Sequence, residues 1–113
     1  MAALDTVAQY VSLARTLLQD TVEDYRYPDA DLVLALSLAI PEAKKLRPDL
    51  FLNKTTQFFT TSDMATAVDI DELYRVPLVY YMIAHVQLRD DEEVQDQRAA
   101  AFLGMFRGML TGT

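Results

Sequence analysis

Histidine and cysteine, the residues that most often perform chemistry, are almost absent from this chain. His85 is the only histidine, and there is no cysteine. This composition excludes a zinc motif with paired histidines and a metal site built on thiolates. His85 also lies among apolar residues, which favours a packed and hydrogen-bonded structural role over catalysis.

Carboxylates are more numerous, but their spacing does not match a cation site. Residues 90–93 form an acidic run without the alternating oxygen ligands and the turn glycine of a calcium loop. Asp69, Asp71 and Glu72 lack that pattern as well. Helix capping and solvation therefore explain these carboxylates better than metal binding does.

The glycines argue against a phosphate-binding loop. They occur only at Gly104, Gly108 and Gly112, so no glycine-rich loop can be assembled. Their spacing of four places small residues along one stripe of a helix, which is only a weak sign of an interface. We therefore predict no catalytic residue, no cofactor and no metal site, and we expect the protein not to be an enzyme.

The composition favours a single all-α domain, residues 1–113. Hydrophobic residues make up 51% of the chain, with only 3 Gly and 4 Pro. The net charge of −7 argues against wrapping nucleic acid, because phosphate binding needs clustered Lys and Arg. The longest uncharged run, residues 76–88, is shorter than the roughly 20 residues of a membrane helix. Residues 1–6 lack a signal-peptide pattern, so we expect a soluble, unexported chain without a membrane partner.

Hydrophobic periodicity predicts a four-helix bundle with helices at about 5–20, 28–47, 71–89 and 91–110. Asp5 or Thr6 caps the first helix, which is amphipathic and carries Arg15 on its polar face. The link that follows is acidic, and its only cation, Arg26, either forms a salt bridge to the end of that helix or is simply solvated.

The second and third predicted helices are apolar around most of their circumference. Ser37 is the only polar interruption in residues 32–40. Each of the two helices also contains a proline. Pro41 predicts a bend near Ile40, whereas at Pro77 either the helix bends or its regular part begins. Two amphipathic partners are too few to cover both apolar helices, so the chain has a surplus of apolar surface.

The connection between these two helices, residues 51–70, is long for a compact bundle. It is rich in Thr, Phe and Val and could form a short β-hairpin with arms at 57–61 and 65–69 and a turn at Ser62 and Asp63. Phe58, Phe59 and Met64 of this loop are expected to cover the apolar helices, together with neighbouring subunits. If so, replacing Phe58 and Phe59 with Ser impairs assembly more than subunit folding. The alternative is that the loop alone covers the apolar helices and the protein is a monomer.

Several segments of the chain together resemble the small adaptor, or head-tail connector, proteins of tailed bacteriophages. The segments are LARTLLQD, YRYPDADLVLALSLAI, LRPDLF and LVYYMIAHVQLRDDEEVQDQRAAAFLGMF. They correspond to an amphipathic first helix ending in Asp, an Arg-aromatic entry to a second helix, an Arg-Pro-Asp exit, and two C-terminal helices joined at an acidic break. The resemblance covers nearly the whole chain except residues 53–69.

The resemblance implies a virion structural protein at the head-tail junction, assembled in the host cytoplasm. Such subunits form a homo-oligomeric ring, commonly twelve-fold, between the portal protein and the tail or nozzle proteins. The ring lines the channel through which DNA passes without specific binding. The sequence ends soon after the last helix, so portal docking would fall to Phe106, Arg107, Met109 and the final residues. The interface candidates are therefore Phe58, Phe59, Met64, Phe106, Arg107 and Met109.

A second function remains open beside the adaptor role. The chain could be a small helical binding or regulatory module with a pocket between helices 28–47 and 71–89. Tyr80, Tyr81 and His85 are the residues expected near that pocket. A ligand that stabilises a folded monomer would distinguish this module from a ring-forming subunit.

Overall fold

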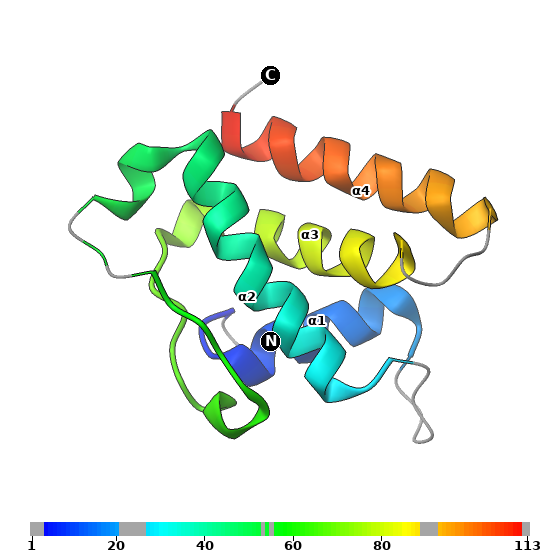
Figure 1. The fold of residues 1–113 in the computed structure, drawn as a ribbon, viewed down its shortest axis with the longest axis horizontal. Helices are drawn as coiled ribbons and strands as arrows, with labels where there is room; N and C mark the ends of the chain where they lie inside the picture. The colour runs from blue at the N-terminus through cyan, green and yellow to red at the C-terminus, as the bar shows by residue number, and fades with distance from the viewer. Residues whose placement is uncertain (1–3, 21–26, 53, 55, 89–92, 112–113) are drawn as a thin grey trace.

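The computed structural model describes residues 4–20, 27–52, 54, 56–88 and 93–111. Within them the chain forms four α-helices and no β-strand, which confirms the all-α fold (Figure 1). The helices are α1 (Val7–Leu18), α2 (Asp29–Leu46), α3 (Arg75–Leu88) and α4 (Glu93–Thr111). Short 3-10 turns lie at Pro48–Phe51, Thr61–Asp63 and Glu72–Tyr74.

Helices α2 and α3 form the centre of the arrangement, because each of them packs against all three other helices. Figure 1 shows α4 lying along α3, with α2 crossing in front of α3 and α1 on the side of α3 away from α4. The core is contiguous and includes the fully buried side chains Val7, Tyr10, Leu32, Leu36, Leu78, Met82, Ile83 and Leu110. The apolar girth of α2 and α3 is thus covered largely within one subunit.

The two internal prolines are accommodated differently. Helix α2 is continuous through Pro41. Before α3 the chain forms the 3-10 turn Glu72–Tyr74, capped by Asp71, whose Oδ1 accepts a 2.9 Å hydrogen bond from the Leu73 amide. Pro77 therefore falls in the first turn of α3, where its missing N–H leaves no carbonyl without a donor. The reading in which regular structure begins near Pro77 is the correct one.

The predicted hairpin in residues 51–70 is wrong, because its second arm pairs with the N-terminal segment instead. Thr6 and Ala67 form an isolated antiparallel bridge. The Val7 amide donates to the Thr66 carbonyl at 3.0 Å, and the Val68 amide donates to the Asp5 carbonyl at 2.9 Å. The expected turn is present as the 3-10 turn Thr61–Asp63.

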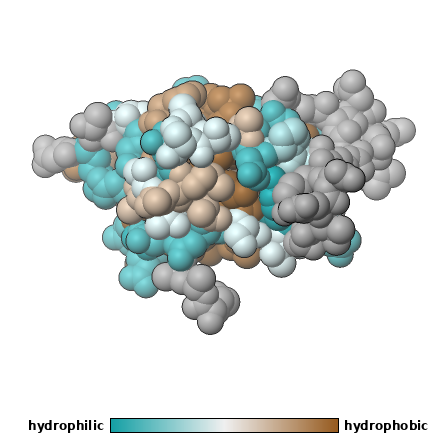
Figure 2. Space-filling model, turned by 90° about the horizontal axis from the view of Figure 1, so that it is seen from below, coloured by the Kyte–Doolittle hydropathy of each residue, from teal (hydrophilic) through white to brown (hydrophobic). Residues whose placement is uncertain are grey.

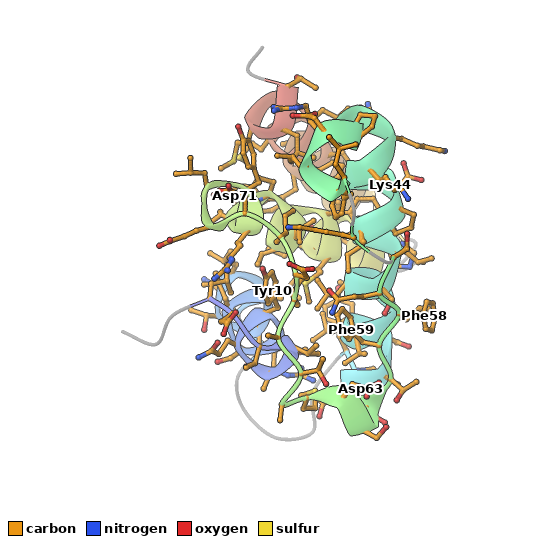
Figure 3. All side chains as sticks on the ribbon, turned by 90° about the vertical axis from the view of Figure 1, so that its left-hand side faces the viewer. Tyr10, Lys44, Phe58, Phe59, Asp63 and Asp71 are labelled. Carbon is orange, nitrogen blue, oxygen red and sulfur yellow. The ribbon has the colours of Figure 1, made fainter. Side chains whose placement is uncertain are left out.

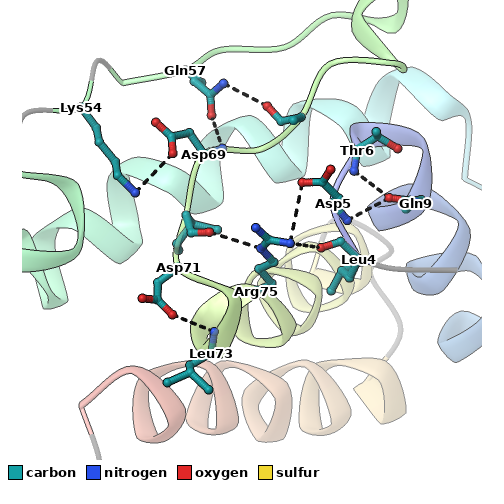
Figure 4. Close-up of polar contacts among 12 residues, drawn as sticks. Leu4, Asp5, Thr6, Gln9, Lys54, Gln57, Asp69, Asp71, Leu73 and Arg75 are labelled. Atoms are coloured by element: carbon teal, nitrogen blue, oxygen red, sulfur yellow. Dashed lines mark hydrogen bonds and ion pairs between the residues drawn. The ribbon is translucent and has the colours of Figure 1, made fainter.

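Arg75, at the start of α3, fixes this junction from below the loop (Figure 4). Its Nε donates to the Ile70 carbonyl at 3.2 Å, and its Nη1 donates to the Leu4 carbonyl at 3.0 Å. The same Nη1 lies 3.7 Å from the Asp5 carboxylate. One guanidinium therefore joins the N-terminal segment, the end of the loop and α3.

Arg15 does not lie on a solvent face, contrary to the prediction. Its side chain is buried at the end of α1. Nη1 donates to Asp20 Oδ2 at 3.1 Å and to the Tyr27 carbonyl at 2.9 Å, and Nη2 pairs with the Asp29 carboxylate. Arg26, expected either to form a salt bridge or to be solvated, lies outside the described residues. Arg15 joins the end of α1 to the start of α2.

Candidate functional site

The six interface candidates separate into core and surface residues. Phe59 and Phe106 are only 3% and 2% exposed, so they belong to the subunit core and are not available to a partner. Met64 is half-buried against that core. Phe58 is 65% exposed, Met109 is 43% exposed, and Arg107 is exposed as well. The phenyl ring of Phe58 is the candidate that the fold presents most openly.

The backbone of Phe59 is fixed to α2 by a single buried hydroxyl. Ser37 Oγ accepts a 2.9 Å hydrogen bond from the Phe59 amide and lies 3.1 Å from both the Phe59 and the Val33 carbonyl oxygens. Ser37 is 1% exposed, so these bonds are shielded from water. The hydroxyl thus holds the loop in the way that a neighbouring strand would, and it aims the Phe59 ring into the core.

The residue on the other side of Phe58 is anchored too. Gln57 Nε2 donates to the Ala67 carbonyl at 3.2 Å, and Gln57 Oε1 accepts from the Asp69 amide at 2.8 Å (Figure 4). Lys54 Nζ lies 3.3 Å from the Asp69 carboxylate. A side chain therefore joins the two arms of the loop where a hairpin would have used backbone pairs. Phe58 projects away from the body of the molecule between two anchored residues (Figure 3).

A pocket of about 230 Å³ lies between α2, α3 and α4. Its lining residues are Glu42, Tyr81, His85, Leu103 and Arg107. The Tyr81 and His85 rings stack with their centroids 6.1 Å apart, and the Tyr81 ring also contacts that of Phe106 at 5.2 Å. Burial raises the pKa of the Tyr81 hydroxyl, and the Glu42 carboxylate raises it further. The hydroxyl is therefore a neutral donor at physiological pH.

The sequence located this pocket only in part. Tyr81 and His85 line it as expected, whereas Tyr80 packs on Phe102, with ring centroids 5.5 Å apart. Helix α4, which the prediction left out, supplies Leu103 and Arg107. The signal was available, because Tyr81 and His85 on α3, and Leu103 and Arg107 on α4, are both pairs spaced by four and so share a helix face.

Exposed apolar side chains also occur around the start of α3 and on α4. Leu73 is 81% exposed, Val76 38%, and Met105 and Met109 43% each. At Gly104 an added Cβ would meet nothing within 4 Å, so packing inside the subunit does not require that glycine. Figure 2 shows hydrophobic surface on a further face, that seen from below, so apolar exposure is not confined to one side.

Arg47 connects the end of α2 to this region. Its guanidinium forms a bidentate pair with Asp49, at 2.9 Å from Nε to Oδ1 and 2.8 Å from Nη2 to Oδ2. It also donates to the Leu110 carbonyl at the end of α4 and lies 5.1 Å from the Tyr74 ring centroid. The hydrogen bonds from Arg47 hold the pKa of Asp49 below its ordinary value. Arg47 thereby joins the end of α2 to the end of α4 and to Tyr74, the residue after Leu73.

The described part of the chain contains no group of three or more His, Cys, Asp or Glu placed to hold a metal ion. None of the helices in the described residues combines the length and the hydropathy that a membrane-spanning segment requires. The described residues carry exposed apolar side chains and a pocket with a mixed polar and apolar lining.

Comparisons with known proteins add no family to this description. No family model matches the chain, and neither curated proteins nor solved structures give a match.

Proposed function

We propose that the protein is a non-enzymatic virion structural protein, a ring-forming head-to-tail adaptor that joins the portal to the tail and lines the DNA exit channel. The proposal rests on the resemblance of the chain to such adaptors and on the distribution of its exposed apolar side chains. Its location is the head-tail junction of the virion, after assembly in the host cytoplasm.

The observation that carries the proposal is that large apolar side chains are exposed on separate faces. Phe58 projects on the α2 side, whereas Asp71, whose carboxylate caps the turn holding Leu73, lies on the opposite side of the molecule (Figure 3). Among the large apolar residues that the structure describes, Leu73 is the most exposed, at 81%. An adaptor contacts neighbours around its ring and different proteins above and below it, so it needs several contact surfaces.

The charge of the chain agrees with a passive channel wall. Its net charge is −7, and an acidic wall repels the phosphates of passing DNA. DNA would therefore move past such a ring without being retained.

The proposal is tested by measuring the mass of the assembled protein. Native mass spectrometry and analytical ultracentrifugation of the purified chain, alone and mixed with its portal, should detect a closed ring of many subunits. A matched pair of variants tests the surface around Leu73. The first variant, Leu73→Ser, should leave the ring intact and weaken the binding of the ring to the portal or the tail. Leu52→Ser, another exposed residue, serves as the control. Monomers alone in both settings would refute the ring.

A second function is favoured by the pocket between α2, α3 and α4. Its volume of about 230 Å³ and its mixture of ring, carboxylate and guanidinium groups suit a small molecule with apolar and charged parts. In that case the protein is a binding or regulatory module. A small ligand that raises the melting temperature of a stable monomer, with the increase abolished in Arg107→Ala, would favour this function over the ring.

A further inference from the structure

The pocket and the exposed Phe58 lie on nearly opposite sides of α2. Ser37 and Lys44 face the loop, since they contact Phe59 and Thr56 respectively. Glu42 follows Ser37 by five positions, and at 100° per residue its side chain points about 140° away from that of Ser37. Glu42 lines the pocket, so the pocket opens on the side of α2 turned away from the loop.

We propose that Phe58 of one subunit inserts into the pocket formed by Glu42, Tyr81, His85, Leu103 and Arg107 of the next copy of this chain. The inference rests on the proposed ring and names its lateral contact. The exposed side chain of Phe58 is the knob of this contact.

The pocket is large enough for a phenyl ring and offers it both aromatic and aliphatic walls. Its volume of about 230 Å³ exceeds the roughly 150 Å³ of a cavity that holds benzene. The stacked rings of Tyr81 and His85 offer edges and faces to a third aromatic ring, and Leu103 adds an apolar wall. The exposed guanidinium of Arg107 can lie over the inserted ring, as cations do on aromatic faces.

The knob is also held ready for insertion before any contact forms. Its two neighbours, Gln57 and Phe59, are anchored by the hydrogen bonds to Ala67, Asp69 and Ser37. Insertion therefore orders little backbone, so that the entropic cost of binding is small. Aromatic side chains that fill a pocket on the partner often dominate the binding energy of protein interfaces.

Charges around the two surfaces are complementary. Lys44 donates to Thr56, two residues before the knob, which gives that side a cation to face the Glu42 carboxylate of the pocket. Asp63, in the turn after the knob, gives a carboxylate to face Arg107. Contacts of this kind favour one orientation of the two subunits.

The placement of knob and pocket determines the symmetry of the assembly. Because they lie on nearly opposite sides of α2, two copies cannot satisfy both contacts at one interface. Each subunit instead gives its knob to one neighbour and receives a knob from the other. A head-to-tail contact of this type closes into a ring when the rotation between subunits allows it.

The experiment removes the knob from one variant and closes the pocket in another. Phe58→Ser keeps an open pocket, and Leu103→Trp keeps the knob while filling the pocket. Each variant alone should be monomeric by native mass spectrometry, with self-association weakened about thirtyfold or more. A mixture of the two should contain a heterodimer with one subunit of each kind and nothing larger, because only one productive contact remains.

Controls separate the contact from effects on folding. Circular dichroism and thermal melts verify that each variant is folded, and Arg107→Trp replaces Leu103→Trp if the latter unfolds. Leu52→Ser, another apolar residue at 69% exposure, should assemble like the wild type.

Two results would overturn the contact. If Phe58→Ser forms the same rings as the wild type, the ring stands and its lateral contact lies elsewhere. If the wild-type chain is still monomeric at about 1 mM, copies do not bind through the knob at all. In that case the proposed adaptor function is tested separately, by measuring whether the chain forms a ring when it is mixed with the portal.

Discussion

Ser37 shows how one hydroxyl determines the path of a long loop. Replacing it with Ala leaves the buried amide and carbonyl of Phe59 without their partner. We expect Ser37→Ala to lower the free energy of unfolding by about 1–3 kcal/mol, as measured by urea denaturation. Ser62→Ala, which removes an exposed hydroxyl bonded to Thr60, should change stability by less than about 0.5 kcal/mol. Equal effects of the two substitutions would show that the hydrogen bonds between Ser37 and Phe59 do not stabilise the fold.

The sequence indicated some of these residues but not their partners. Ser37 stood out as the one polar position in an apolar segment, yet its partner Phe59 lies 22 residues away and depends on the path of the loop. Phe59 was assigned to an interface together with Phe58, because composition alone cannot tell which of two adjacent rings points inward. Replacing both rings would remove core packing as well, at a cost of about 3–5 kcal/mol for a buried Phe. Phe58 alone is therefore the informative position.

At the scale of the elements, Arg15 joins the end of α1 to the start of α2. Arg15→Met keeps much of the apolar stem and removes the bonds to Asp20, Asp29 and the Tyr27 carbonyl. Because Asp20 and the carbonyl lie in a partly buried site, we expect a loss of about 2–3 kcal/mol in urea or thermal unfolding. Asp29 is 53% exposed and contributes little of this.

The control for Arg15 is a cation at the surface. Lys45→Met breaks a 3.7 Å pair with Glu42 that is exposed to water, and it should change stability by less than about 1 kcal/mol. If Arg15→Met were no more harmful than Lys45→Met, the link between α1 and α2 would not depend on the guanidinium.

The helices were easier to predict than their connections. Charge and proline marked both ends of the second helix, predicted at 28–47 and observed as α2, Asp29–Leu46. The first helix begins after Thr6, where the Gln9 side chain accepts hydrogen bonds from the Asp5 and Thr6 amides at 2.9 and 2.8 Å. Such signals are local and can therefore be read from the sequence.

The predicted hairpin within residues 51–70 was wrong because the backbone of this loop pairs with a segment distant in the sequence. Residues 65–69 have the composition of a strand, but the Asp5 to Val7 segment offers them its backbone groups, and Gln57 occupies the other side. The predicted position of Arg15 on a polar helix face was wrong for a related reason, because helical periodicity treats every polar residue as exposed. The long side chain of Arg15 can instead be buried, because a buried carbonyl and two carboxylates lie within its reach.

For the whole molecule, the sequence predicted the helical class and a surplus of apolar surface, but not where the surplus remains. Most of it is covered by α4 and by loop residues such as Phe51, Phe59 and Ile70. Among the described residues, the large apolar side chains left most exposed are Leu52, Phe58 and Leu73. That distribution depends on how four helices cross, which periodicity within single helices does not determine.

Arg47 pairs with Asp49 nearby in the chain and also bonds the distant end of α4. Arg47 bonds Asp49 while holding the Leu110 carbonyl and the Tyr74 ring, so the pair contributes to the docking of α4 on α2 and α3. The pKa of Asp49 is lowered from its ordinary value of 3.8, chiefly by the hydrogen bonds from Arg47. The folded state therefore binds this proton less tightly than the unfolded state does. Its stabilising effect is complete above the ordinary pKa and is lost as the pH falls through the lower pKa of the folded protein.

Melting temperatures of the wild type and of Asp49→Asn, measured from pH 7 down to about pH 2, test this sign. The wild type should melt higher at neutral pH, and the two curves should converge as the pH falls from the ordinary pKa of 3.8 through the lower pKa of folded Asp49, where the protonated side chain resembles Asn. In an Arg47→Gln background the same substitution should have no pH-dependent effect, because the partner that lowers the pKa is gone. A constant difference between wild type and Asp49→Asn across the whole range would contradict the pairing of Arg47 with Asp49 in solution.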